Sequence, residues 1–271
     1  KPDLVALTGG YRKVPVLQIG ADVYCDTHLI AEVLDARQSE PSLRAVAGHF
    51  SDIVEHWVDV NLFARAVGYT FGALADLLPD ALLEDRAALR GAPLDREALK
   101  RALPLATQEL HTHIAWLDTA LRGPHSFING ETPGNGDFTL YATLWFLANG
   151  RFDFNAHPSV QSWMNRMIAI GHGQRQDISA EEALIEAAAA LPAPLPSSAH
   201  EGSPDATGLS LGQTVQVTPE QLGHGTSVTG QLVSLLPHRL TLRLCTDRCG
   251  EVHVHFPRTG YRLKAIQADQ A

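Results

Sequence analysis

The chain has 271 residues, of which 45% are hydrophobic and 19% are charged, a composition typical of globular proteins that excludes collagen-like, coiled-coil and wholly disordered chains. Its 21 basic and 30 acidic residues give a formal charge of −9, which argues against nucleic-acid and anionic-lipid partners because both repel a negative protein. No apolar stretch reaches the roughly 18 residues of a membrane span, the first residues lack the pattern of a signal peptide, and the three cysteines do not make a disulfide framework. These features predict a cytoplasmic protein with no membrane partner.

In the first 38 residues, the spacing of apolar residues along the chain changes three times. Residues 2–7 favour a short helix ended by two glycines, and residues 14–19 and 23–25 favour two antiparallel strands joined by a tight turn. The pair Asp26-Thr27 then offers a helix start, since short polar side chains cap the free amides of a first helical turn. The expected order is helix, strand, turn, strand and helix.

A helical block follows from about residue 41 to residue 190, where apolar residues recur at helical spacing. Pro104 is expected to kink or shorten the second of its helices, because proline lacks the amide that an inner helical turn needs. The helices are predicted through residues 53–62, 99–121, 138–148 and 160–170, with a last one opening at Ser179.

Residues 191–208 are rich in proline, serine and glycine, and they are predicted to form a linker. From about Leu209 to Ile266, apolar residues alternate with polar ones between Gly, Pro and Asp turns, which indicates short β-strands. The chain shows no internal repeat. Two or three domains are therefore expected.

Two motifs near the N-terminus carry a family resemblance. The first is Lys13-Val14-Pro15-Val16-Leu17, and the second, after a tight turn, is Cys25-Asp26-Thr27-His28-Leu29-Ile30. Together with the order of the elements around them, they resemble the glutathione-binding half of cytosolic glutathione S-transferases.

Two later stretches extend this resemblance. The helical block is similar to the C-terminal domain of the same family in Phe127-Ile128-Asn129-Gly130, in Asp137 and in His157-Pro158 before Trp163. The last region is similar to a small β-domain appended to some proteobacterial members, which ends in a stretch like His255-Phe256-Pro257-Arg258-Thr259-Gly260-Tyr261. One departure is Gly134, which stands where most members place a Ser or Thr helix cap, so this helix start is expected to lack a side-chain bond.

The resemblance implies a partial α/β thioredoxin-like domain, then an all-α helical bundle, followed by a small all-β barrel-like domain. The expected boundaries are 1–38 for the glutathione-binding domain, 39–190 for the helical domain, 191–208 for the linker and 209–271 for the β-domain. A homodimer is the expected assembly under this resemblance. The β-domain is expected to bind a protein partner or to self-associate.

The resemblance also implies a glutathione site made by Lys13, Val14, Pro15, Asp26 and Thr27. A cis peptide before Pro15 would leave the backbone of Val14 at an open edge, where an extended peptide such as glutathione can add as an antiparallel strand. The helix start at Thr27 suits the α-carboxylate of a γ-glutamyl group, while Asp26 can meet its ammonium group. The alternative is that Asp26 and Thr27 only cap a helix and that Pro15 is an edge-strand proline.

The catalytic residue of the family lies in a strand and helix that would precede Lys1, so it is expected in a segment before this sequence begins. Such a residue would stabilise the thiolate of glutathione, which then attacks a small hydrophobic electrophile or exchanges with a disulfide. The electrophile is expected against the helix that carries His56, Trp57 and Phe63, although core packing is the favoured explanation of these aromatic residues. Cys25 is interpreted as a small buried residue, because a neighbouring carboxylate raises the pKa of a thiol.

Two cysteines and two histidines gather near the C-terminus and resemble a zinc ligand set: Cys245, Cys249, His253 and His255. If Leu244 pairs with Val252, which keeps the apolar faces of the two strands together, Cys245 and both histidines share the opposite face and Cys249 lies in the turn. However, the spacing of the cysteines is unusual for zinc, and simple alternation on a solvated strand face also produces a His-x-His pattern. Metal binding is therefore not favoured.

Two functions remain open on the sequence. The first is a glutathione transferase-like enzyme that uses glutathione as cosubstrate for conjugation or thiol exchange. The second is a non-catalytic scaffold of the same fold that dimerises or recruits a partner through its β-domain.

Overall fold

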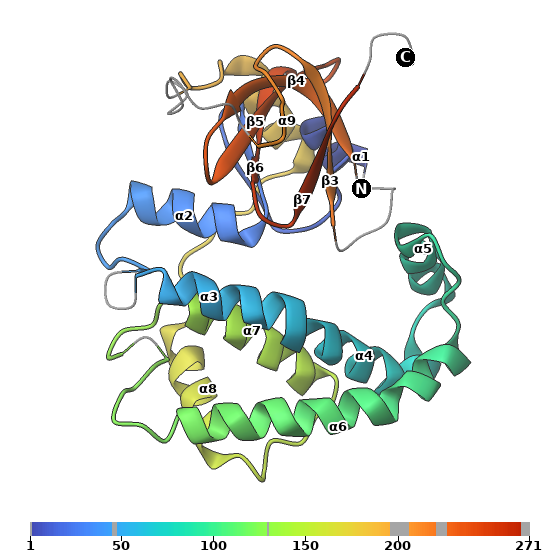
Figure 1. Cartoon of the computed structure of the whole chain (residues 1–271), viewed down its shortest axis with the longest axis vertical. Coiled ribbons are helices and arrows are strands. Elements are labelled where there is room, and N and C mark those ends of the chain that lie inside the picture. Colours follow the sequence, from blue (N-terminus) through green and yellow to red (C-terminus); the bar gives the residue numbers. More distant parts are fainter. Residues whose placement is uncertain (1, 45–47, 129, 196–205, 221–226, 267–271) are drawn as a thin grey trace. The chain divides into compact units, whose positions relative to one another are not determined.

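The computed structural model of the chain describes residues 2–44, 48–128, 130–195, 206–220 and 227–266. Asn129 and part of the predicted linker lie outside the described residues. The chain divides into two compact units (Figure 1). The sheet unit comprises Lys1–Val33, Ala88–Ala92 and Gln176–Ala271, and the helical unit comprises Leu34–Ala87 and Pro93–Arg175.

The sheet unit is built on a seven-stranded sheet in the order β1-β2-β6-β5-β4-β3-β7. The pair β2 and β6 is parallel, and the other neighbouring strands are antiparallel. The strands are β1 (Val16–Ile19), β2 (Asp22–Cys25), β3 (Thr214–Pro219), β4 (Val228–Leu235), β5 (Arg239–Thr246), β6 (Gly250–Pro257) and β7 (Tyr261–Ala265). The helices of this part of the chain are α1 (Pro2–Thr8), α2 (Thr27–Arg37), which follows β2, and α9 (Ala180–Ala189).

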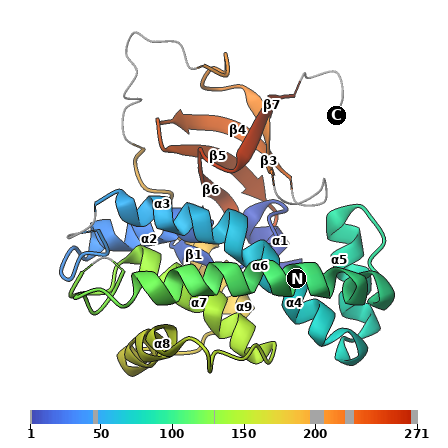
Figure 2. The ribbon, with the colours of Figure 1, turned by 60° about the horizontal axis from the view of Figure 1, so that its bottom comes forward.

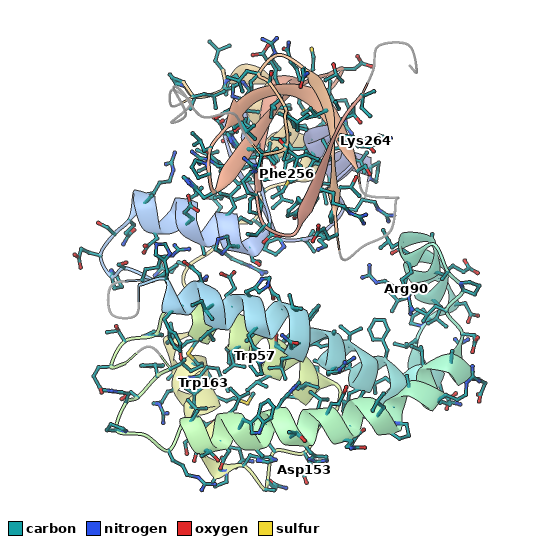
Figure 3. The ribbon with its side chains drawn as sticks, viewed as in Figure 1. Trp57, Arg90, Asp153, Trp163, Phe256 and Lys264 are labelled. Atoms are coloured by element: carbon teal, nitrogen blue, oxygen red, sulfur yellow. The ribbon has the colours of Figure 1, made fainter. Side chains whose placement is uncertain are left out.

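One apolar core serves the whole sheet unit. It contains Val23 of β2, Leu184 of α9 and Phe256 of β6, and Figure 3 places Phe256 among the strands. Val23 pairs directly with Val254 of the parallel neighbour β6. The sheet therefore joins two segments, near the two ends of the chain, that the sequence analysis assigned to different domains.

The helices between α2 and α9 agree with the predicted helical block, with two differences. Helix α6 continues through Pro104 over 25 residues, so the proline does not shorten it. Helices α4 (Phe63–Ala73) and α5 (Asp80–Arg90) lie outside the predicted helical ranges. The elements are α3 (Phe50–Trp57), a π-helical turn (Val58–Leu62), α4 (Phe63–Ala73), a 3₁₀ turn (Ala75–Leu77), α5 (Asp80–Arg90), α6 (Arg96–Ala120), α7 (Asn135–Asn149) and α8 (Pro158–Ile170).

The helical unit is packed around α7 and α8. Trp163 of α8, labelled in Figure 3, is fully buried. Leu140 and Leu144 of α7 and Ile114 of α6 are fully buried in the same core. Helix α6 packs along α4, as Figure 2 shows. The apolar faces predicted from helical spacing are thus the faces that form this core.

The first turn of α7 is capped by side chains of another helix. Gly134 stands at the cap and provides no side-chain bond, as expected. The amide of Gly136 instead donates to Oγ of Ser51 at 2.8 Å, and the side-chain amide of Asn135 donates to Glu55 at 2.7 Å. A Cβ on Gly136 would lie 3.1 Å from Cγ1 of Val54, so a glycine here lets α3 come close enough for the hydroxyl to reach.

Replacing Ser51 by alanine should therefore remove a helix cap even though Ser51 lies in a different helix. We expect the free energy of unfolding to fall by about 1 kcal/mol, the usual cost of losing a serine cap. Urea unfolding of Ser51→Ala measures this loss, and Ser159→Ala, at the start of α8, is the control because the amide of Ser159 rather than its hydroxyl makes the bond to Asp118. Equal stability of Ser51→Ala and wild type would contradict the capping role.

Candidate functional site

The predicted glutathione-binding residues lie together around β1, β2 and the start of α2. The Val14–Pro15 peptide bond is cis. Val14 is 63% exposed and precedes the paired residues of the β1–β2 hairpin, which begin at Val16. Strand β1 is the first strand in the sheet order, so one of its edges has no partner strand among the residues described above.

Asp26 forms the junction between β2 and α2. Its φ angle is 84°, in the left-handed region that residues other than glycine rarely adopt. Its carbonyl accepts the amide of Ile30 at 3.0 Å, and its Oδ1 accepts the amide of His28 at 3.1 Å. Asp26 thus caps α2 as the sequence predicts, but with a strained backbone that the sequence does not reveal.

The other predicted binding residues surround this junction. Thr27, the first residue of α2, is exposed, so its hydroxyl is open to a ligand. Lys13 is half-buried beside the exposed pair Val14 and Pro15. Cys25 is fully buried, and burial followed by the charge of Asp26 raises the pKa of its thiol, which agrees with its interpretation as an inert core residue.

The carboxylate of Asp26 has a second partner that sequence reasoning did not find. The hydroxyl of Tyr261, at the start of β7, donates to Oδ2 of Asp26 at 2.9 Å. The hydroxyl of Tyr11 lies 3.1 Å from that of Tyr261. Burial, and then the charge of Asp26, raises the pKa of Tyr261, and burial likewise raises the pKa of Tyr11. Both tyrosines therefore stay protonated and act as donors.

The three residues predicted for the electrophile pocket differ in their surroundings. His56 is exposed on α3, while Trp57 is half-buried with its ring 5.5 Å from that of His113. Phe63, at the start of α4, is 44% exposed and its ring lies 5.9 Å from that of Phe146. Trp57 packs against the helical core, so the packing explanation favoured from the sequence accounts for part of its surface.

The four candidate metal ligands do not gather. The pairing of Leu244 with Val252 is as expected from the sequence. Cys245 is nevertheless exposed, whereas Cys249 is buried with its Sγ 3.8 Å from the carbonyl of Ala6. Among the residues that the structure describes, no three of the four predicted ligands bring their ligating atoms within 4.8 Å of one another.

The two histidines instead surround the carboxylate of Asp22, and both are buried rather than solvated. Nε2 of His255 lies 2.8 Å from Oδ1 of Asp22, and Nδ1 of His255 lies 2.9 Å from the hydroxyl of Thr241. Because a carboxylate can only accept, His255 carries its proton on Nε2 and accepts from Thr241. Nδ1 of His253 is 3.9 Å from Asp22, beyond hydrogen-bond distance.

Comparison with known proteins agrees with this architecture. Residues 1–42 match the family model of the glutathione S-transferase N-terminal domain, and residues 63–166 match that of the C-terminal domain. A GST-like protein from Pseudomonas syringae is 34% identical, with 98% of this chain and 86% of that chain covered and a TM-score of 0.74. The chain belongs to the glutathione S-transferase family. Because nearly the whole chain is matched, the similarity to this GST-like protein includes the strands β3 to β7.

Two further solved structures share less sequence with this glutathione S-transferase family member. FzlA from C. crescentus is 18% identical over 62% of this chain and 71% of its own, with a TM-score of 0.47. A glutathione S-transferase from Rhodospirillum rubrum is 18% identical over 64% of this chain and 72% of its own, also with a TM-score of 0.47. A comparison with curated proteins finds no match.

The fold class predicted from the sequence is confirmed, with a thioredoxin-like segment, a helical bundle and a β-region. The β-region differs from a free-standing module in sharing its sheet with β1 and β2. Within the described residues, no helix of this glutathione S-transferase family member has both the length and the apolar character needed to cross a membrane.

Proposed function

We propose that this protein binds reduced glutathione at the junction of β2 and α2 and transfers its thiol to a small hydrophobic electrophile, or exchanges it with a disulfide. The observation that carries the proposal is the carboxylate of Asp26, which is held by two donors at the start of a helix and next to the exposed hydroxyl of Thr27. We further propose that the protein acts in the cytoplasm as a homodimer.

The chemistry of glutathione fits these residues in three places. The carboxylate of Asp26 is suited to the γ-glutamyl ammonium, because a charge-assisted hydrogen bond is stronger than a neutral one. The amides at the start of α2 and the hydroxyl of Thr27 are suited to the γ-glutamyl carboxylate. The backbone of Val14, an exposed residue, can pair with the extended cysteinyl segment, with Lys13 and Pro15 beside it.

The reaction requires the thiol of glutathione to ionise, since the thiolate is the nucleophile. Cys25 is not a candidate for the exchanging thiol, because it is fully buried and its pKa is raised. The proposed electrophile contacts are Trp57 and Phe63, which offer partly exposed aromatic surface, with the exposed His56 on the same stretch of helix. No metal takes part in this proposal.

Replacing Asp26 by alanine tests the proposed site. We expect the affinity for reduced glutathione to fall by about 1.5–3 kcal/mol, or about 10- to 150-fold, because the ammonium of the ligand would lose a charged partner. Isothermal titration calorimetry of reduced glutathione into wild type and Asp26→Ala measures the change.

Asp3→Ala is the matched control, since it removes an exposed carboxylate of the same unit whose ion pair, within the described part of the chain, is with the surface arginine Arg248. Its affinity should equal that of wild type. Saturable binding that Asp26→Ala leaves unchanged would reject the proposed site, and the absence of binding to wild type would favour the non-catalytic scaffold.

A further inference from the structure

The turn that follows β6 leads to Tyr261, the first residue of β7, whose side chain reaches the proposed glutathione site. Gly260 has a φ of 80°, which allows the tight turn that carries the chain from β6 into β7. Tyr261 then pairs with Pro219 of β3, and its ring lies 5.5 Å from that of Phe256. Only 6% of the surface of Tyr261 is exposed. Strand pairing and core packing therefore fix the position of its hydroxyl.

The two hydrogen bonds at this hydroxyl have a definite direction. Tyr261 has a single hydroxyl proton, which it donates to Oδ2 of Asp26. The bond between the two tyrosines must then be donated by Tyr11, whose hydroxyl lies 3.1 Å away and which is 1% exposed. A buried chain of donors thus leads from Tyr11 through Tyr261 to the carboxylate.

We propose that Tyr261 is a positioning residue for glutathione, which orients the carboxylate of Asp26 toward the γ-glutamyl ammonium. This inference rests on the proposed function of Asp26. The bond to His28 holds Oδ1 and the bond from Tyr261 holds Oδ2, so the plane of the carboxylate is fixed before the ligand arrives. Both donors are neutral, so the carboxylate keeps its negative charge for the ammonium. Strand β7 is therefore part of the binding site.

A structural tie between β7 and the start of α2 would use the same hydrogen bond. A structural role and a positioning role of Tyr261 predict different effects on ligand affinity. Only the effect of a positioning role depends on the ammonium group of the ligand. Glutaryl-cysteinylglycine is glutathione without its α-amino group, and it keeps the rest of the molecule. If Tyr261 acts by orienting Asp26, its substitution should weaken the binding of glutathione and leave the affinity for this analogue unchanged.

The experiment is calorimetric titration of both compounds into wild type, Tyr261→Phe and Asp26→Ala. Phenylalanine keeps the ring packing and removes only the hydroxyl, so we expect Tyr261→Phe to bind glutathione about tenfold more weakly. Its affinity for glutaryl-cysteinylglycine should equal that of wild type. Tyr69→Phe is the control, since it removes a hydroxyl in the helical unit whose acceptor is the carbonyl of Arg151.

Three results would overturn the inference. If Asp26→Ala weakens glutathione binding and Tyr261→Phe does not, the proposed site stands and the positioning role fails. If Tyr261→Phe weakens both compounds equally, the hydroxyl has only a structural role. If wild type binds no glutathione, the proposed function and this inference fail together.

Tyr11→Phe keeps the inference testable if Tyr261→Phe does not fold. It leaves the bond between Tyr261 and Asp26 in place and removes only the donor behind it, so the expected loss of glutathione affinity is smaller, about threefold. The analogue should again be unaffected. A loss that is equal for the two compounds would contradict the positioning role here too.

Discussion

Replacing Asp137 by alanine is expected to lower the free energy of unfolding by about 4 kcal/mol, because three donors, two of them buried, would lose their acceptor together. Oδ1 of Asp137 accepts the amide of Ile128 and the indole N–H of Trp163, each at 2.9 Å. Oδ2 accepts the amide of Gly134 at 3.1 Å. Asp137 is fully buried, so water cannot replace the lost acceptor without a cavity opening in the helical core.

Urea unfolding followed by tryptophan fluorescence measures this loss. The free energy of unfolding of Asp137→Asn should lie between those of wild type and Asp137→Ala. The amide keeps one accepting oxygen, but its NH₂ group faces one of the former donors. Asp153→Ala is the control because its carboxylate is exposed and accepts only the amide of Asn155, so its effect should stay below about 1 kcal/mol. A loss in Asp137→Ala as small as in this control would mean that the core tolerates the three unpaired donors.

The contrast between Asp137 and Ser51 shows what local sequence can predict. The start of α7 was predicted from helical spacing, which is a local feature, and from the family resemblance at Asp137. The departure from the family pattern identified Gly134 as a cap without a side-chain bond, and the structure shows none. It could not find the replacement cap from Ser51, since that bond joins residues 85 positions apart and depends on the close approach of two helices at Gly136.

The candidate site shows the same limit. The turn and helix start around Asp26 were predictable, because a strand, a short polar pair and a helical apolar spacing follow one another directly. The partner Tyr261 lies 235 positions away and reaches Asp26 only because β6 adds to the sheet beside β2. No pattern within either segment encodes that pairing. It is a tertiary feature that requires the assembled sheet.

The histidines of β6 show how a correct register can still lead to a wrong environment. The pairing of Leu244 with Val252, which the sequence analysis considered as one condition for a shared face, is observed. Alternation then suggested a solvated face for His253 and His255, but both are buried because β2 pairs with β6 and brings Asp22 against them. A strand that is buried on both faces can still alternate polar and apolar residues in its sequence, provided that its polar side chains hydrogen-bond to other buried groups.

Replacing Asp22 by alanine is expected to lower the free energy of unfolding by about 3 kcal/mol at pH 7.5, because the buried Nε2–H of His255 and the partly buried amide of Ala193 would lose their charged acceptor. Nε2–H of His255 and the amide of Ala193 donate to its two oxygens at 2.8 and 2.7 Å. Asp247→Ala, in the exposed turn between β5 and β6, is the control and should change stability by less than about 0.5 kcal/mol. A loss no larger than that of the control would show that these two donors find other partners.

The same variant should also steepen the loss of stability in acid. Burial lowers the pKa of His255 and His253 in the folded protein, while Asp22 opposes this shift for both. For Asp22, burial alone would raise its pKa, but the bonds from His255 and Ala193 hold it below the ordinary value of 3.8. As the pH falls below about 6.5, the ordinary histidine pKa, the unfolded chain binds protons before the folded one does, so the stability contributed by neutral histidines decreases.

Removing Asp22 takes away the group that raises the pKa of both histidines, so the gap between the folded and unfolded pKa values widens. Urea unfolding between pH 7.5 and pH 5 should therefore show a steeper decline for Asp22→Ala than for wild type. The carboxylate of Asp22 in wild type stays ionised over this range, because its own pKa is lowered, so the histidines alone govern the difference. Parallel curves for the two proteins would mean that Asp22 does not set the protonation of His255.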